Sequence, residues 1–195
     1  MNRVLVAYAT NAGSTAEVAQ AVGEELARTG ARVDVRRLDE TAGIDGYGVV
    51  VIGAPMIMGW HRAAMRFVKK HQHDLAKVKV GYFLTAMSLT QTDHQLPETP
   101  VAVDPGLAKP PKRSGRLSFR ERWATLDEYL KPVLKAAPEV RPVGVGVFAG
   151  KLDPALLNWW QKLFVTKVVG AQPGDYRNWP FIREWASRLG EQIGH

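Results

Sequence analysis

Apolar runs alternate along the chain with segments in which apolar residues recur every three or four positions. The run from Val4 to Ala9 is apolar on both faces and rich in β-branched residues, which is typical of a central parallel strand. A helix is predicted directly after it, over Thr15 to Arg28, because Val18, Val22 and Leu26 lie at helical spacing between polar residues. The chain therefore begins with a strand, a short loop and a helix.

The same two patterns continue toward the C-terminus. Further apolar strands are predicted at residues 48–54, 78–86 and 142–150, and further helices at 63–75, at 123–136 and from Trp179 onward. Residues 31–38 alternate apolar with charged positions, which predicts a strand nearer the sheet edge. This alternation predicts an α/β fold with a doubly wound, five-stranded parallel sheet in a three-layer α/β/α sandwich. A length of 195 residues suits one domain, residues 1–195, with a sizeable core.

Composition narrows the classes of function. The chain has no cysteine, which excludes disulfides, thiolate nucleophiles and cysteine-ligated metal sites and fits a cytoplasmic protein. The N-terminus shows no signal-peptide pattern, and no apolar stretch reaches the roughly 18 residues that a membrane-spanning helix needs. A formal net charge of +7 implies an anionic partner, either a membrane surface or a nucleic acid. Nucleic acid is the less favoured partner, because the aromatic residues lie in apolar runs and do not alternate with basic ones.

The loop between the first strand and the first helix has the composition of an anion site. Its residues are Thr10, Asn11, Ala12, Gly13, Ser14 and Thr15. The first amides of a helix lack internal partners, hydroxyl groups add donors, and a glycine lets the backbone curl around a phosphate. The loop has no lysine or arginine and no P-loop pattern, so hydrolysis of a nucleoside triphosphate is not expected. The alternative is that these small residues only cap the helix, and the sequence leaves both interpretations open.

This loop resembles the FMN phosphate loop of the flavodoxin superfamily, in which Thr/Ser-x-Thr-Gly-x-Thr follows the first strand. Ala12 stands where that pattern has its middle hydroxyl. The resemblance implies a flavodoxin-like sheet with strand order 2-1-3-4-5 and FMN as the cofactor. In such sheets the ligand lies beyond the carboxyl ends of the strands, at the topological switch point.

Two further loops are expected at that edge of the sheet. The segment after strand 48–54 consists of Pro55, Met56, Ile57, Met58, Gly59 and Trp60. Bulky apolar side chains in a loop favour a flat ligand that covers them, and the alternative is packing against the next helix. The resemblance implies that this segment flanks the isoalloxazine ring, with Met56, Met58 and Trp60 as stacking candidates. It also implies flavin contacts from Met87, Ser88 and Leu89, after the fourth strand.

Two segments, at about 90–119 and 151–178, fall outside the regular alternation and are predicted to be insertions. Five prolines between Thr90 and Phe119 argue against regular structure, and its end is basic. The favoured interpretation is a disordered basic surface loop, and the alternative is a lid over the flavin or an arm that meets anionic lipid or a propionate-bearing substrate. In the second insertion, Leu156 to Val169 is apolar around most of a helix. That helix suits either a membrane interface or packing on the sheet or at a dimer contact.

Outside 90–119 the chain most resembles the flavodoxin-like, quinone-dependent protoporphyrinogen oxidases of bacteria. The similarity is carried by Val50 to Ala54, by Phe67 to His71, and by an aromatic- and lysine-rich insertion between Gly150 and the turn Asp175 to Trp179. It implies an FMN-dependent oxidoreductase of haem biosynthesis, which passes electrons from a porphyrinogen to a quinone and associates peripherally with the inner membrane face. The alternative is an electron-transfer protein that docks a redox protein partner through its basic surface. The sequence shows no catalytic triad, paired carboxylates or metal-ligand cluster, so no catalytic side chain and no metal are assigned.

Overall fold

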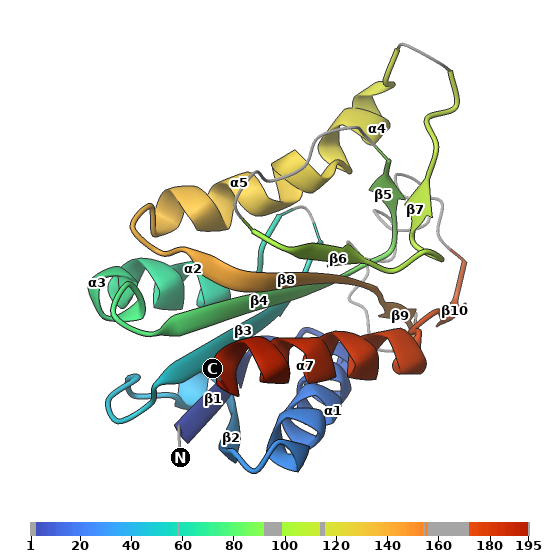
Figure 1. Ribbon diagram of the computed structural model, residues 1–195. Coiled ribbons are helices and arrows are strands. Elements are labelled where there is room, and N and C mark those ends of the chain that lie inside the picture. Colours follow the sequence, from blue (N-terminus) through green and yellow to red (C-terminus); the bar gives the residue numbers. More distant parts are fainter. Residues whose placement is uncertain are drawn as a thin grey trace.

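A parallel sheet forms the centre of the molecule (Figure 1). The computed structural model describes residues 3–57, 59–91, 99–113, 116–153, 155 and 172–194. The sheet has six strands in the order β2-β1-β3-β4-β8-β6, and every pairing in it is parallel. These strands are β1 (Arg3–Tyr8), β2 (Arg32–Arg37), β3 (Val49–Pro55), β4 (Lys79–Ala86), β6 (Val101–Val103) and β8 (Pro142–Ala149). The five strands predicted from the sequence correspond to β1, β2, β3, β4 and β8. They are confirmed, and they lie in the predicted order 2-1-3-4-5.

The sixth strand corrects the prediction of five. Strand β6 lies at the sheet edge beside β8 and comes from the segment 90–119, which was predicted to lack regular structure. The described part of that segment also contains β5 (Leu89–Thr90) paired with β7 (Ala108–Lys109), and the start of helix α4 (Phe119–Trp123). Prolines are compatible with short strands at a sheet edge, where only one side of the backbone needs hydrogen-bond partners. The prediction was therefore wrong for these residues.

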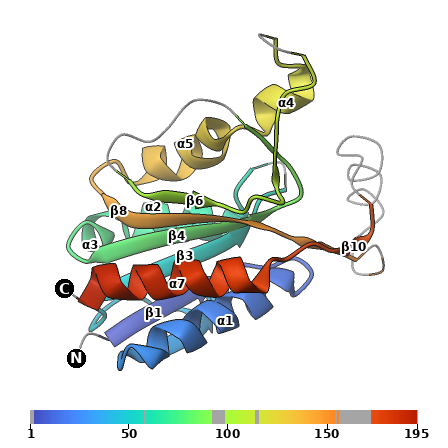
Figure 2. The same ribbon diagram turned by 45° about the vertical axis from the view of Figure 1, so that its right-hand side comes forward.

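Helices cover both faces of the sheet (Figures 1 and 2). Helices α1 (Ser14–Arg28) and α7 (Trp179–Gly194) pack on one face, and α2 (Arg62–Lys70), α3 (Gln72–Leu75) and α5 (Leu126–Ala136) lie on the other. Strands β1, β3 and β4 are buried over nearly their whole length, because helices shield both of their faces. The three-layer sandwich is confirmed.

Two predicted helices differ from the structure. The helix predicted at 63–75 is interrupted at His71, between α2 and α3. The helix predicted at 123–136 begins only at Leu126 of α5, whereas Trp123 belongs to the preceding helix α4. The chain is divided between α4 and α5 because Thr125 has extended backbone angles and its side chain accepts a hydrogen bond from the Glu128 amide at 3.4 Å. Pro132 lies inside α5 without ending it. The division matters for function, since it lets α4 point away from the body of the molecule (Figure 2).

The sheet depends on glycines that leave room for aromatic rings. A Cβ atom on Gly53 in β3 would lie 1.9 Å from the ring of Phe83 in β4, and one on Gly146 in β8 would lie 2.9 Å from Trp185 of α7. These glycines therefore serve core packing, and no larger residue fits without displacing an aromatic side chain.

After β8 the chain forms a short antiparallel pair, β9 (Lys151–Leu152) with β10 (Gly174–Asp175), at the carboxyl end of the sheet. The remaining short element is the 3-10 helix η1 (Leu38–Glu40). The apolar helix predicted from Leu156 to Val169 lies outside the described residues. Among the residues that are described, no helix is long and apolar enough to span a membrane.

Candidate functional site

A pocket of about 570 Å³ lies at the carboxyl ends of β1, β3 and β4. This volume falls within the range of small-molecule and cofactor sites. The lining comes from four places in the chain: the loop after β1, the end of β3 with its loop, the loop after β4, and the wall made by α4, α5 and β9. The lining residues are Asn11, Ala12, Ser14, Pro55, Met56, Ile57, Gly59, Met87, Ser88, Phe119, Arg120, Trp123, Ala124, Glu128, Tyr129, Pro132, Lys151, Leu152 and Asp153.

The loop after β1 presents unpaired donors to the pocket. Gly13 has φ 81°, in the left-handed region, and forms the N-cap of α1 without any side-chain cap. The backbone N–H groups of residues 11–15 donate no hydrogen bond to any residue that the structure describes. The Thr10 hydroxyl is buried and likewise has no partner among the described residues. Since no hydroxyl caps the helix, the capping interpretation does not account for this loop.

Thr15 differs from the other hydroxyl residues of the loop. Its side chain is fully buried, and its Oγ1 lies 3.0 Å from Oγ1 of Thr85 in β4. Either hydroxyl can be the donor. A hydroxyl that accepts from Thr85 keeps its own proton for a ligand, so the pair does not remove Thr15 from the set of candidate donors.

The loop after β3 contributes to the pocket through Pro55, Met56, Ile57 and Gly59. Trp60, a stacking candidate in the sequence, does not line the pocket. It is 7% exposed and its Nε1 donates a hydrogen bond of 2.5 Å to the Tyr129 carbonyl.

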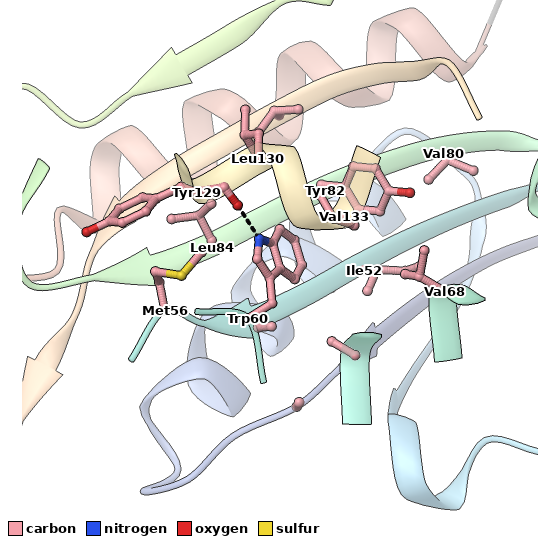
Figure 3. Close-up of a cluster of buried hydrophobic side chains, with 14 of the residues drawn as sticks. Ile52, Met56, Trp60, Val68, Val80, Tyr82, Leu84, Tyr129, Leu130 and Val133 are labelled. Atoms are coloured by element: carbon pink, nitrogen blue, oxygen red, sulfur yellow. Dashed lines mark hydrogen bonds between the residues drawn. The ribbon is translucent and has the colours of Figure 1, made fainter. Parts of the chain in front are cut away.

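Figure 3 shows this ring in the core, and its centroid lies 5.9 Å from that of Tyr82 in an edge-on contact. For Trp60 the structure therefore supports the alternative of packing against the helical layer. Met58 lies outside the described residues.

The loop after β4 also reaches the pocket. Met87 and Ser88 line it, whereas Leu89 is 4% exposed and packs in the core. The Tyr129 hydroxyl donates a 2.6 Å hydrogen bond to the Ser88 carbonyl and so holds this loop to α5. Burial raises the pKa of Tyr129 to about 12, so the hydroxyl keeps its proton at neutral pH.

Two aromatic residues on α4 were missed by the sequence analysis. Phe119 and Trp123 are 69% and 62% exposed, their ring centroids are 6.0 Å apart, and both line the pocket. Their spacing of four residues places them on one face of a helix, which was the available signal. It was overlooked because Phe119 fell in the segment predicted to be a loop. The two rings form an apolar rim at the pocket mouth, from a helix that projects from the sandwich (Figure 2).

The sequence matches a family model. The flavodoxin domain model covers residues 5–177, which is most of the chain. This chain belongs to the flavodoxin domain family. Among curated proteins, no sequence matches it. Family membership supports FMN as the cofactor and a role in electron transfer.

Solved structures show the same fold at low sequence identity. A flavodoxin from Megasphaera elsdenii superposes with a TM-score of 0.52 and 13% identity, over 96% of this chain and 98% of that one. An archaeal flavodoxin gives 0.52 and 11%, over 99% of each chain. The flavodiiron core of a Synechocystis protein gives 0.53 and 11%, over 99% of this chain but 36% of that one. The fold of this chain is thus shared with whole flavodoxins and with one part of the longer flavodiiron chain.

The residues of the pocket fit an FMN molecule. The loop after β1 borders the pocket with Asn11, Ala12 and Ser14, its main-chain amides are unpaired, and the buried Thr10 hydroxyl beneath it has no partner among the described residues; the neighbouring walls are largely apolar. The loop has no cationic side chain, so the phosphate would be held by amide and hydroxyl donors and by the N-terminal end of the α1 dipole.

Proposed function

We propose that this flavodoxin domain binds FMN in the pocket at the carboxyl ends of β1, β3 and β4 and acts as an oxidoreductase. The observation that carries the proposal is the unpaired donor set at residues 10–15, in a loop whose Asn11, Ala12 and Ser14 line a largely apolar pocket. The phosphate would lie against the amides around Gly13 and the Thr10 hydroxyl. The ring would lie between the loop of Met56 and Ile57 and the loop of Met87.

Bound FMN supplies reversible uptake and release of one or two electrons. The protein's own residues bind and orient it. Met56, Ile57 and Met87 would exclude water from the ring, and the Tyr129–Ser88 hydrogen bond holds the loop of Met87 and Ser88 in place beside it. A less polar surrounding disfavours charge on the ring, so these residues also tune its redox potential.

The absorption spectrum of the purified protein tests the proposal. We expect bands typical of bound flavin, release of FMN on denaturation, and binding of about one FMN per chain to the protein freed of cofactor. Riboflavin lacks the phosphate and should bind at least about tenfold more weakly, because the donor set at residues 10–15 then has no anion to meet. A protein that neither contains flavin nor takes up added FMN contradicts the proposal.

For the reaction, we propose oxidation of a porphyrinogen with transfer of the electrons to a quinone, as in the protoporphyrinogen oxidases that the sequence resembles. The rim of Phe119 and Trp123 supports this proposal, since exposed rings beside Arg120 and Lys151 suit a planar apolar molecule that bears carboxylates. The protein would then work in the cytoplasm or peripherally at the inner membrane face. Anaerobic turnover of protoporphyrinogen with a soluble quinone is the expected result. Failure with several quinones, in a protein that contains FMN, argues against this reaction.

The second candidate is an electron carrier that docks a redox protein. It is favoured by the charge of the segment before and within α4, since residues 109–122 contain six lysines and arginines and one acidic residue, Glu121. Opposite charge steers the encounter of redox partners and makes its rate depend on salt. Rapid, salt-sensitive reduction of the bound flavin by a reductase, without porphyrinogen turnover, would select this candidate over the enzyme.

A further inference from the structure

A buried arginine joins the loop after β1 to the β9–β10 pair. The side chain of Arg177 is 3% exposed, although it follows β10 at the molecular surface. Its Nη1 donates to the Ser14 carbonyl at 3.3 Å, and Ser14 lines the pocket. Its Nε and Nη2 donate to the two carboxylate oxygens of Asp175 at 2.8 and 2.6 Å. The guanidinium also lies 4.5 Å from the centre of the Trp179 ring.

These contacts fix two walls of the pocket against each other. Ser14 begins α1, and its carbonyl is held by an arginine that comes 163 residues later in the chain. Asp175 pairs with Lys151 in the strand pair β9–β10, and Lys151 lines the same pocket. A planar guanidinium suits this arrangement, because its donors point in several fixed directions at once. Arg177 therefore links the loop after β1 to the β9 wall through direct hydrogen bonds.

Arg177 also balances charge beside the proposed phosphate. Its Nη1 lies 3.0 Å from the carboxylate of Glu17, in the first turn of α1. Together, Arg177, Glu17 and Asp175 carry one positive and two negative charges. Without the arginine, the carboxylate of Glu17 would stand unpaired at the same helix end that must attract a phosphate. The Glu17 carboxylate and a phosphate carry charges of the same sign and repel each other. Removal of Arg177 would therefore weaken binding of an anion more than binding of a neutral molecule.

We propose that Arg177 is a positioning residue for the phosphate end of the pocket. It holds the Ser14 turn in place and pairs with the Glu17 carboxylate, which lowers the repulsion that a doubly charged group meets at the amides around Gly13. The inference rests on the proposed FMN function. It explains how a loop without a lysine or arginine of its own can bind a phosphate next to an acidic residue.

The ratio of FMN affinity to riboflavin affinity tests this role. Riboflavin has the same ring and no phosphate, so a general structural defect would weaken both ligands alike. We expect Arg177→Gln to weaken FMN binding by about tenfold or more and riboflavin binding by less than about threefold, since the exposed charge of Glu17 and the released Ser14 turn affect only the ligand that bears a phosphate. Arg177→Lys keeps the charge but loses the fork of donors, and should fall between the wild type and Arg177→Gln.

Two further variants separate charge from packing. Glu17→Gln in the Arg177→Gln background should recover part of the lost FMN affinity, because the unpaired carboxylate is then removed while the contact to the Ser14 carbonyl stays lost. Arg183→Gln is the matched control, since Arg183 of α7 also pairs with glutamates of α1, at 3.4 Å from Glu24 and 3.8 Å from Glu25. It lies away from the loop after β1, and its FMN-to-riboflavin ratio should equal that of the wild type.

The outcomes distinguish this inference from the proposed function. A wild-type protein that binds no FMN overturns both. A wild type that binds FMN, with Arg177→Gln unchanged or weakened equally for both ligands, overturns only the role of Arg177. If Arg177→Gln does not fold, the variants Arg177→Lys and Glu17→Gln still test the inference. Arg177→Lys should lower the ratio of FMN affinity to riboflavin affinity, and Glu17→Gln should raise it. An unchanged ratio in both variants would reject the inference.

Discussion

Replacing Thr10 with valine should shift protein stability and cofactor affinity in opposite directions. The Thr10 hydroxyl is buried and has no partner among the described residues, so the protein without cofactor carries the cost of an unmet hydrogen bond. Valine has nearly the same shape and no hydroxyl. We expect Thr10→Val to stabilise the cofactor-free protein by about 1 kcal/mol, because a buried polar group without a partner is removed.

The same substitution removes a donor to the proposed phosphate. A hydrogen bond to a charged group contributes about 1.5–3 kcal/mol, which corresponds to a loss of FMN affinity of roughly ten- to 150-fold. Riboflavin affinity should change little, since that ligand has no phosphate. Urea unfolding of the cofactor-free protein gives the change in free energy, and quenching of flavin fluorescence gives the two dissociation constants.

Thr29→Val is the control for this experiment. The Thr29 hydroxyl donates to the Leu26 carbonyl at 2.7 Å, at the other end of α1. Its loss should destabilise the protein by about 1 kcal/mol and leave FMN affinity unchanged. The reasoning about the loop is refuted if Thr10→Val behaves like Thr29→Val, with lower stability and unchanged binding of FMN.

Three other predictions follow from the core and from α4. Gly53→Ala should destabilise the protein by about 3 kcal/mol or prevent folding, because the new methyl group overlaps the ring of Phe83; a wild-type urea midpoint would contradict this. Trp60→Phe should lower the free energy of unfolding by about 2 kcal/mol, since it removes the donor to the Tyr129 carbonyl, yet leave the flavin spectrum unchanged; a shifted spectrum would instead place the Trp60 ring next to the flavin. The Lys112 amide and the Ser118 side chain and amide hold the pKa of Glu121 down, from 4.5 to about 2. The resulting stabilisation of α4 is present above pH 4.5 and lost as the pH falls toward 2, so Glu121→Gln should abolish any change in Trp123 fluorescence over that range.

The sequence by itself determined the central architecture. Four of the five predicted strands are local apolar runs, the strand at 31–38 alternates apolar with charged residues, and α1 and α7 each show helical spacing over more than three turns. Such patterns depend only on neighbours in the chain, because periodic burial is imposed by the element's own geometry. The loop from Thr10 to Thr15 was located for the same reason, since it joins two strongly patterned elements.

Tertiary structure alone decided which residues face the pocket. Trp60 lies in the core, where its indole N–H donates a hydrogen bond to the carbonyl of Tyr129, 69 residues later in the chain. Phe119 and Trp123 reached the pocket rim because Thr125 ends the preceding segment and starts a new helix. Residues 101–103 form the edge strand β6 because they pair with the outer side of β8, at Val145 to Val147. Arg177 contacts Ser14 because α7, which begins two residues after it, packs beside α1. In each case the deciding partner is remote in sequence, and a local pattern of polar and apolar residues holds no information about which remote group will be its neighbour.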